Sequence, residues 1–184
     1  KGDVLQTEGK AVTGVRTIKL GTVMLTRSGP DGTSRPVAMV GRGHLLDMLP
    51  LLGQKTRLGV RALSAGRTCE LPARALTDIL LSHDPALLGS LYGHLSLTLE
   101  RLADWGHVMR LRGLPRQLVA TLLLLAQEQG TRTVRLPSHI ALSELLRTSR
   151  ESVARTLGLL EEGGVLQRVD RWHVTLGPNH LVVF

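Results

Sequence analysis

Cysteine is almost absent: Cys69 is the single cysteine among 184 residues. One cysteine excludes a disulfide within the chain, a zinc finger and an iron–sulfur cluster held by cysteines alone. Aromatic side chains are also scarce, with two Trp, one Tyr and one Phe, whereas base stacking on single-stranded nucleic acid needs several rings. No apolar run approaches the ~20 residues that span a membrane, and no secretory signal is present. We therefore expect a cytoplasmic protein that makes no membrane contact.

The chain combines a positive net charge with the amino-acid composition of a globular protein. Hydrophobic residues make up 42%, the formal net charge is +8 and the calculated pI is about 10.9. A strongly basic protein suits a polyanionic partner such as nucleic acid. Most of the excess lies in residues 1–114, so the arrangement of individual arginines carries more weight than net charge. The histidines form no set of three or four ligands, and we assign no metal.

Residues 138–162 predict two short helices that meet at a sharp corner, Ser138–Leu146 and Ser149–Glu162. Apolar side chains recur at helical spacing and define the buried faces, which are Ile140, Leu142, Leu145 and Leu146 in the first helix, and Val153, Leu157 and Leu160 in the second. Such a pair is the helix-turn-helix layout, whose second helix enters a DNA major groove.

The caps of these helices are readable from the sequence. Ser138 follows Pro137 and is a natural N-cap for the first helix. Thr148 can cap the second helix, and Thr148 with Glu151 fits the spacing of a capping box.

The second helix carries side chains that suit base reading. Arg150, Glu151 and Arg155 lie within one and a half turns. The planar fork of Arg matches the O6/N7 edge of guanine, and Glu accepts from cytosine N4. Ser149 and Ser152 can donate to phosphates beside the helix N-terminus. On spacing alone, the alternative is a solvated amphipathic helix with an internal Glu151–Arg155 ion pair.

The first eighty or so residues predict short strands separated by glycine turns, which is typical of an all-β roll or barrel. Expected strands are Val12–Leu20, Thr22–Thr26, Arg35–Val40, Val60–Leu63 and Thr68–Leu71. The last two are separated by residues 64–67, which favours a hairpin between them.

A long helix is predicted over 84–112, opened by Asp84 and Pro85. Apolar residues repeat every seven positions along it and form a coiled-coil-like seam, which Leu99 thickens. We expect this seam to form a dimer interface through Leu88, Leu91, Leu95, Leu102, Trp105 and Met109. Packing of the helix on its own β-domain is the alternative, and both can hold at once.

The remaining segment completes a second small domain. Gly113 and Pro115 break the long helix, and 116–129 predicts an apolar core helix followed by a short strand over 133–136. After the helix-turn-helix, Val165–Val169 and Trp172–Leu176 predict a hairpin, which would be the wing of a winged helix. Arg168, Arg171 and His173 either touch phosphates there or belong to a merely structural wing.

The run TSRESVARTLGLLEEGGVL resembles the DNA-binding signature of the cyclic-AMP receptor / fumarate-nitrate regulator (CRP/FNR) family of bacterial transcription factors. Its motif Ser-Arg-Glu-(Ser/Thr)-Val-x-Arg is matched by residues 149–155. The resemblance implies that Arg150 and Arg155 read guanines and that Glu151 reads a cytosine, in a GTGA-type half-site. We place these three residues at the DNA interface together with Ser138, His139, Thr148, Ser149 and Ser152. The family usually has Gly in the turn, where this chain has Arg147.

The N-terminal part resembles the cyclic-nucleotide-binding-like β-roll of the same family, with Gly2, Gly9 and Gly21 at matching intervals. The resemblance starts at Lys1 without an initiator Met, so we expect a trimmed, processed or disordered N-terminus. It implies an α+β fold with a β-roll sensor over 1–83, a dimerisation helix and hinge over 84–113, and a winged helix-turn-helix over 114–184.

The ligand positions that the resemblance implies are altered. Cyclic-AMP binders of the family carry Gly-Glu for the ribose and Arg-Ser for the phosphate, where this chain has Asp47-Met48 and Thr56-Arg57. A gap shifted by one residue puts Lys55-Thr56 at the second place. Leu102-Ala103 stands where the family reaches the base with Thr-Ser. We therefore predict no cofactor, with cyclic AMP disfavoured although possible.

The function favoured by these features is a homodimeric, sequence-specific transcription regulator that reads a palindromic GTGA-type site in double-stranded DNA. The expected partners are DNA, a second copy of the chain and RNA polymerase. The alternative within the family is a cyclic-AMP-responsive regulator. The alternative of another class is an enzyme or small-molecule-binding module, for which the sequence offers no signature spacing. We predict that the protein is not an enzyme.

Overall fold

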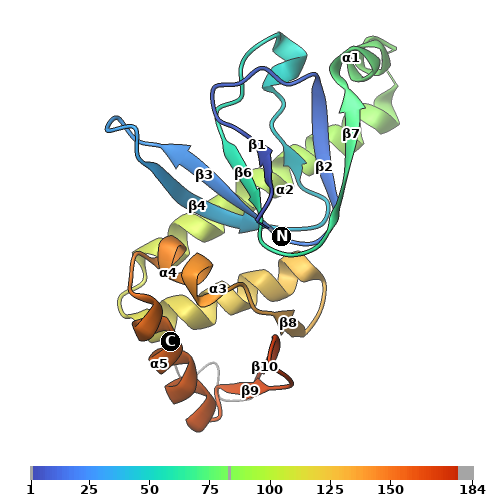
Figure 1. The fold of residues 1–184 in the computed structure, drawn as a ribbon. Coiled ribbons are helices and arrows are strands. Elements are labelled where there is room, and N and C mark those ends of the chain that lie inside the picture. Colours follow the sequence, from blue (N-terminus) through green and yellow to red (C-terminus); the bar gives the residue numbers. More distant parts are fainter. Residues whose placement is uncertain (1, 83, 178–184) are drawn as a thin grey trace. The chain divides into compact units, whose positions relative to one another are not determined.

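The computed structural model describes residues 2–82 and 84–177 (Figure 1). The chain forms two compact units, Lys1–Ala103 and Asp104–Phe184. The expected α+β fold is confirmed, because antiparallel sheets are combined with helices in the chain.

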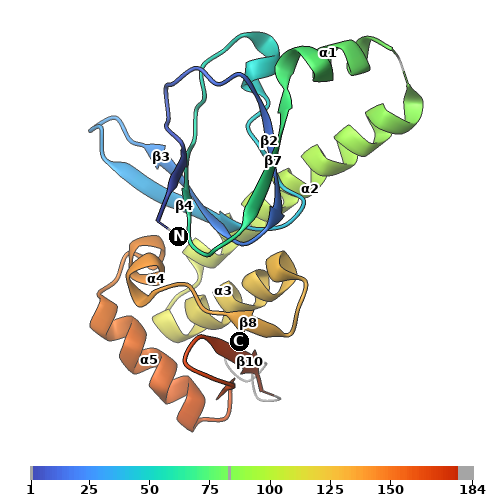
Figure 2. The same ribbon diagram turned by 45° about the vertical axis from the view of Figure 1, so that its right-hand side comes forward.

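The N-terminal unit is built on two antiparallel sheets that curl around a shared interior (Figure 2). The four-stranded sheet contains, in spatial order, β1 (Val4–Gln6), β6 (Gly59–Ala62), β3 (Val23–Ser28) and β4 (Ser34–Val40). The three-stranded sheet contains β5 (Leu45–Leu46), β2 (Gly14–Leu20) and β7 (Arg67–Pro72). Their inward side chains form an apolar core that includes Ile18, Met24, Met39, Val40 and Val60.

The expected hairpin between residues 60–63 and 68–71 is wrong. Strand β6 pairs with β1 and β3, whereas β7 pairs with β2 in the other sheet. The turn between β6 and β7 packs against the turn between β2 and β3, and both carry the chain from one sheet to the other. A Cβ on Gly66 would lie 2.2 Å from the Leu20 carbonyl oxygen. The close approach of two backbones therefore requires Gly66, and Gly21 faces it with φ of +93°.

The sequence analysis did not predict two short helices of the N-terminal unit. The 3₁₀ helix η1 (Leu49–Leu52) follows β5, and helix α1 (Ala73–Leu81) follows β7. Helix α1 is preceded by Pro72 and has no side-chain cap, so the usual signal for a helix start is missing.

Helix α2 (Pro85–Arg110) begins at the predicted place, because the Asp84 carboxylate accepts from the Ala86 and Leu87 backbone N–H groups at 2.9 and 3.4 Å. Trp105 is entirely buried in the chain, while Tyr92 and Leu99 are 66% and 70% exposed. In the part of the chain that the structure describes, no helix combines the length and the apolar character that a membrane span needs.

The C-terminal unit surrounds helix α3 (Leu114–Gln129), whose Leu118, Val119, Leu122 and Leu125 are fully buried as expected. The other elements are β8 (Thr133–Arg135), α4 (His139–Leu146), α5 (Arg150–Glu162), β9 (Leu166–Arg168) and β10 (His173–Leu176). The strands form a sheet of order β8-β10-β9. The predicted wing hairpin is confirmed, because β9 and β10 pair antiparallel.

Candidate functional site

Helices α4 and α5 meet at a corner (Figure 2). Hydrogen bonds and one left-handed residue fix this corner. Ser138 caps α4 as predicted, and its Oγ accepts from the Ala141 N–H at 3.2 Å. The helix ends at Arg147, which has φ of 54° and ψ of 46°. The Thr148 N–H then donates back to the Ser143 carbonyl at 3.1 Å. A residue with a Cβ is disfavoured in this left-handed conformation, so Arg147 holds it under strain.

The predicted cap of the second helix is wrong by one residue. Ser149 is the N-cap of α5, and its Oγ accepts from the Ser152 N–H at 3.0 Å. The Thr148 N–H donates to the Ser143 carbonyl at the end of α4, so it is not the donor to Glu151 that a capping box requires. The capping box of Thr148 with Glu151 therefore does not form, and Glu151 stands at the second helical position.

The buried faces of the two helices agree with the sequence, apart from Ile140. Val153, Leu157 and Leu160 of α5 are 0%, 2% and 6% exposed. In α4 the buried residues are Ala141, Leu142, Leu145 and Leu146, whereas Ile140 is 53% exposed. Ile140 lies on the solvent side because the buried stripe of this two-turn helix is centred on Leu142 and Leu145.

The opposite side of α5 presents the residues predicted to read DNA. Arg150, Glu151 and Arg155 are all exposed. Among the residues that the structure describes, no ion pair joins Glu151 to Arg155. The intrahelical pair of the alternative reading is therefore not formed, and all three charged groups face solvent beside the helix N-terminus.

Local electrostatics set the charge states of two residues at this surface. The pKa of Glu151 is lowered by its own backbone N–H and by the Ser149 hydroxyl, so its carboxylate is an acceptor at neutral pH. Partial burial lowers the pKa of His139, and the charges of Arg150 and Arg168 lower it further. His139 is therefore neutral at pH 7 and stands close to two permanent cations.

Of the other predicted interface residues, Thr148, Ser149 and Ser152 lie at this corner, whereas Ser138 and His139 lie at the start of α4. Ser138, His139, Thr148 and Ser152 are half-buried, and Ser149 is exposed. Oγ of Ser149 and Oγ of Ser152 are 3.0 Å apart. The start of α5 thus gathers Ser149, Ser152 and the residues predicted to read DNA, and the charge of Arg150 reaches His139 at the start of α4.

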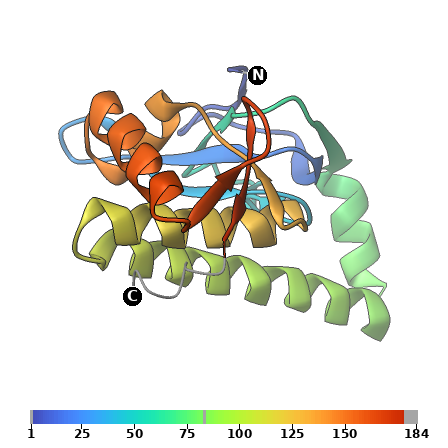
Figure 3. The same ribbon diagram turned by 90° about the horizontal axis from the view of Figure 1, so that it is seen from below.

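The wing lies beside α5, and contacts between α5 and β9 hold the two together (Figure 3). Its tip is closed by Asp170, whose Oδ1 accepts from the Trp172 and His173 N–H groups at 2.6 and 2.9 Å. The Arg171 guanidinium lies 4.8 Å from the centre of the Trp172 ring. Arg168 Nε pairs with Glu161 Oε2 at 3.3 Å, which joins the wing to α5.

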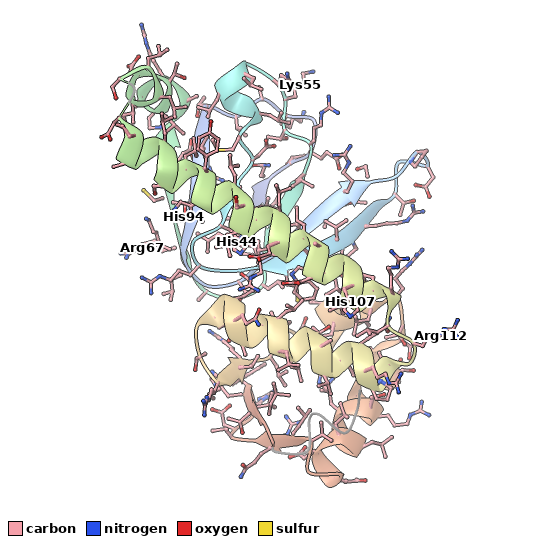
Figure 4. The ribbon with its side chains drawn as sticks, turned by 180° about the vertical axis from the view of Figure 1, so that it is seen from behind. His44, Lys55, Arg67, His94, His107 and Arg112 are labelled. Carbon is pink, nitrogen blue, oxygen red and sulfur yellow. The ribbon has the colours of Figure 1, made fainter. Side chains whose placement is uncertain are left out.

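In the β-roll, the two segments that stand where the resemblance places the ribose and phosphate contacts do approach one another. Asp47 has φ of 70°, and its Oδ2 accepts from the Arg57 N–H at 3.2 Å. Thr56 is 2% exposed and turns inward, where its Oγ1 donates to the Thr7 and Lys10 carbonyls at 2.8 and 3.2 Å. Lys55 and Arg57 are exposed, and Lys55 extends outward from the loop in Figure 4.

The third position at which the resemblance implies a ligand contact is on α2, where Leu102 is half-buried and Ala103 is exposed. Neither side chain has a polar group for a base edge. Within residues 2–82 and 84–177, no cluster of three or more His, Cys, Asp or Glu is arranged to hold a metal ion.

Comparison with known proteins assigns both units. Residues 1–83 match the family model of the cyclic nucleotide-binding domain, and residues 116–179 match that of the Crp-like helix-turn-helix domain. No curated protein matches the chain significantly. The two domain matches, in this order, span most of the chain. The protein therefore belongs to the CRP/FNR family of transcription regulators and carries its DNA-binding helix-turn-helix.

Solved structures share the fold over nearly the whole chain. FixK2 from Bradyrhizobium japonicum is 18% identical with a TM-score of 0.80, and the match covers 100% of this chain and 91% of that one. A CRP-family transcriptional regulator from Thermus thermophilus is 19% identical with a TM-score of 0.75, covering 99% and 92%. The c-di-GMP-responsive global regulator CLP of Xanthomonas campestris is 19% identical with a TM-score of 0.69, covering 96% and 91%.

The strain at the corner generates a first prediction. Arg147→Gly removes the Cβ that the left-handed conformation disfavours, so we expect the free energy of unfolding to rise by about 0.5–1 kcal/mol. In a chain of this size the melting temperature then rises by about 1–4 °C. Arg147→Ala keeps the Cβ and is expected to give no rise. Thermal unfolding followed by circular dichroism checks both, and equal behaviour of the two variants would contradict strain at this residue.

Proposed function

We propose that the protein is a homodimeric regulator that reads a palindromic, GTGA-type site in double-stranded DNA and does so without cyclic AMP. The observation that carries the proposal is the division of α5. Its apolar side packs into the C-terminal unit, whereas Arg150, Glu151 and Arg155 are exposed on the side facing away from it.

Each exposed side chain has a partner in the major groove. Arg150 and Arg155 each present a planar fork to guanine O6 and N7, and Glu151 accepts from cytosine N4. The lowered pKa of Glu151 supports this role, because only the ionised carboxylate is purely an acceptor. Backbone N–H groups at the start of α5 face phosphates. Arg171 at the wing tip adds a further exposed cation, and the family resemblance extends the expected partners to RNA polymerase.

The base-reading assignment is testable with duplex DNA selected by the purified protein from a random pool. Arg155→Ala should weaken binding to the selected site by about 1–3 kcal/mol, which is roughly 5- to 150-fold, and relax specificity at one base pair. Arg132→Ala removes an exposed cation from the loop before β8 and is the matched control. Fluorescence anisotropy measures both affinities. Unchanged affinity and specificity for Arg155→Ala would refute the assignment.

The dimer proposal rests on one face of α2. Leu88, Leu95 and Leu102 repeat every seven residues and are half-buried. The exposed apolar residues between them are Tyr92 and Leu99, which gives the alternating spacing of four and three residues of a coiled-coil seam. Gly106 continues this spacing, and a Cβ there would meet open space. Trp105 is buried in its own chain, so the proposed seam leaves it out, together with half-buried Leu91, which lies on the same side of the helix as Trp105. Half-buried Met109 follows Gly106 at three-residue spacing and stays in the proposed seam.

A substitution at Leu99 tests the dimer more cleanly than one at Leu102, because Leu102 is half-buried in its own chain. Leu99→Asp places a charge at a residue that is 70% exposed, so the fold should tolerate it, whereas burial against a partner helix would leave the charge unpaired. Ser90→Asp puts the same charge on an exposed position on the opposite side of α2. In analytical ultracentrifugation we expect monomers for Leu99→Asp and dimers for Ser90→Asp. A dimeric Leu99→Asp protein would exclude this seam.

Independence from cyclic AMP is supported by the direction of side chains around residue 56. A bound cyclic phosphate requires a facing cation or several donors. Here the inward side chain is Thr56, whose hydroxyl is already engaged, and Lys55 and Arg57 are exposed. The Asp47 carboxylate, which would repel a phosphate, accepts from the Arg57 N–H.

Calorimetric titration of cyclic AMP into the purified protein tests this part of the proposal. Losing a charge-assisted hydrogen bond costs about 1.5–3 kcal/mol, and several such losses should abolish micromolar binding. We expect no measurable heat of binding and the same DNA affinity with and without the nucleotide. Micromolar binding accompanied by tighter DNA binding would establish the alternative, a cyclic-AMP-responsive regulator.

A further inference from the structure

An unusual carboxylate lies where the β-roll brings three segments together. Asp47 is one of two described non-glycine residues with positive φ, and the other is Arg147 at the DNA-binding corner. Its Oδ1 accepts from the Leu49 N–H at 2.9 Å, and its Oδ2 accepts from the Arg57 N–H at 3.2 Å. The side-chain amide of Gln6 lies 3.5 Å from the same Oδ2. One carboxylate therefore joins β1, the turn after β5 and the segment before β6.

The donors around this carboxylate are uncharged and preorganised. Gln6 is 7% exposed, and its Nε2 is also 3.0 Å from the Leu58 carbonyl, which fixes the direction of the amide. Thr56 anchors the same segment from the other side through its bonds to the Thr7 and Lys10 carbonyls. A set of converging N–H donors is a binding site for an anion. Here the anion belongs to the chain.

We propose that Asp47 is a built-in anion that occupies the anion site of the β-roll and holds segment 54–58 in place without a ligand. The proposal extends the independence from cyclic AMP proposed above. It adds that the Asp47 carboxylate occupies the N–H donors of the site, so the site has more than a changed set of side chains. The left-handed conformation of Asp47 is the strain that accompanies this arrangement, since a Gly would adopt it freely.

The arrangement also explains the position of the cations nearby. With a carboxylate inside, an inward Lys or Arg would be the partner of Asp47 and not of a ligand. The chain instead turns neutral Thr56 inward and exposes Lys55 and Arg57. The outer surface is further tied by Arg27, whose Nη1 donates to the Arg57 carbonyl at 3.0 Å. Asp47 and Arg27 therefore clamp segment 54–58 through the two backbone groups of Arg57: Asp47 accepts from its N–H, and Arg27 donates to its carbonyl.

The proposal predicts that removing the carboxylate creates a site for an external one. Asp47→Gly keeps the backbone conformation, removes the strain and leaves the N–H donors facing an opening large enough for formate or acetate. We expect sodium acetate to raise the melting temperature of this variant by about 2–4 °C with saturation, and sodium chloride at equal ionic strength to have no such effect. The native protein should show no saturable response, because its site is occupied.

Two variants make the test specific. Asp31→Gly removes another carboxylate of the β-roll, which accepts from the Thr33 N–H at 3.1 Å and pairs with Arg35. The guanidinium that this change releases is exposed and, among the described residues, has no converging N–H donors beside it, so the variant should show no saturable acetate response. Asp47→Asn fills the same space without charge and should also show none. An equal acetate response in Asp31→Gly, or the absence of one in Asp47→Gly, would overturn the proposal.

Proteolysis gives a second readout that does not depend on the global stability of the variant. Lys55 and Arg57 are exposed trypsin sites on the clamped segment. Cleavage after these residues, mapped by mass spectrometry, should be several-fold faster in Asp47→Gly than in the native protein, and acetate should slow it. Unchanged cleavage would show that Asp47 does not hold the segment. Both readouts concern the β-roll, so their failure is distinguishable from a failure of DNA binding or of the cyclic-AMP test.

Discussion

The direction in which α5 presents its side chains depends on the corner at residues 147–149. Arg147 reverses the chain in a left-handed conformation, and Ser149 starts the next helix one residue later than the Thr148 alternative. Successive helical residues are about 100° apart, so the burial of Val153 and Leu157 then fixes the exposed side. The cap, the strained residue and the apolar stripe together set the rotation of α5 about its own axis. This rotation decides whether Arg150 and Arg155 lie on the surface or in the protein interior.

The β-roll illustrates a constraint of a different kind, namely backbones that approach too closely for side chains. The two turns that exchange strands between the sheets touch at Gly21 and Gly66. Local sequence at residues 60–71 shows two strands and a turn, which is also the pattern of a hairpin. The choice between the two outcomes is made by β2 and β3, some forty residues earlier, because each of these strands offers an edge to a different partner. The sequence of residues 60–71 alone therefore cannot predict which strands pair.

The sequence predicted those elements whose signals are local and strong. The two helices of the helix-turn-helix, the wing and the core helix α3 have clear periodicity, caps or glycine breaks, and the structure contains all of them. The cap of α5 was misassigned because Thr148 and Ser149 are adjacent and chemically alike. Two hydrogen bonds distinguish them in the structure: the Thr148 N–H donates back to Ser143, and the Ser149 Oγ accepts from the Ser152 N–H. The engagement of Asp47 by Gln6 and Arg57 was not predictable, since these residues are distant in sequence and carry no motif.

Helix α2 shows how one periodic pattern can serve two surfaces. The stripe of Leu88, Leu95 and Leu102 can be completed by Leu91 and Trp105, which lie three residues after Leu88 and Leu102. It can instead be completed by Tyr92 and Leu99, which lie four residues after Leu88 and Leu95. The sequence analysis took the first set for the dimer seam and treated Leu99 as thickening the stripe. In the structure Trp105 is buried and Leu99 is exposed, so the two completions lie on adjacent faces about 100° apart. The shared leucines are half-buried because they stand between these faces, one turned to the core of the chain and the other available to a second copy.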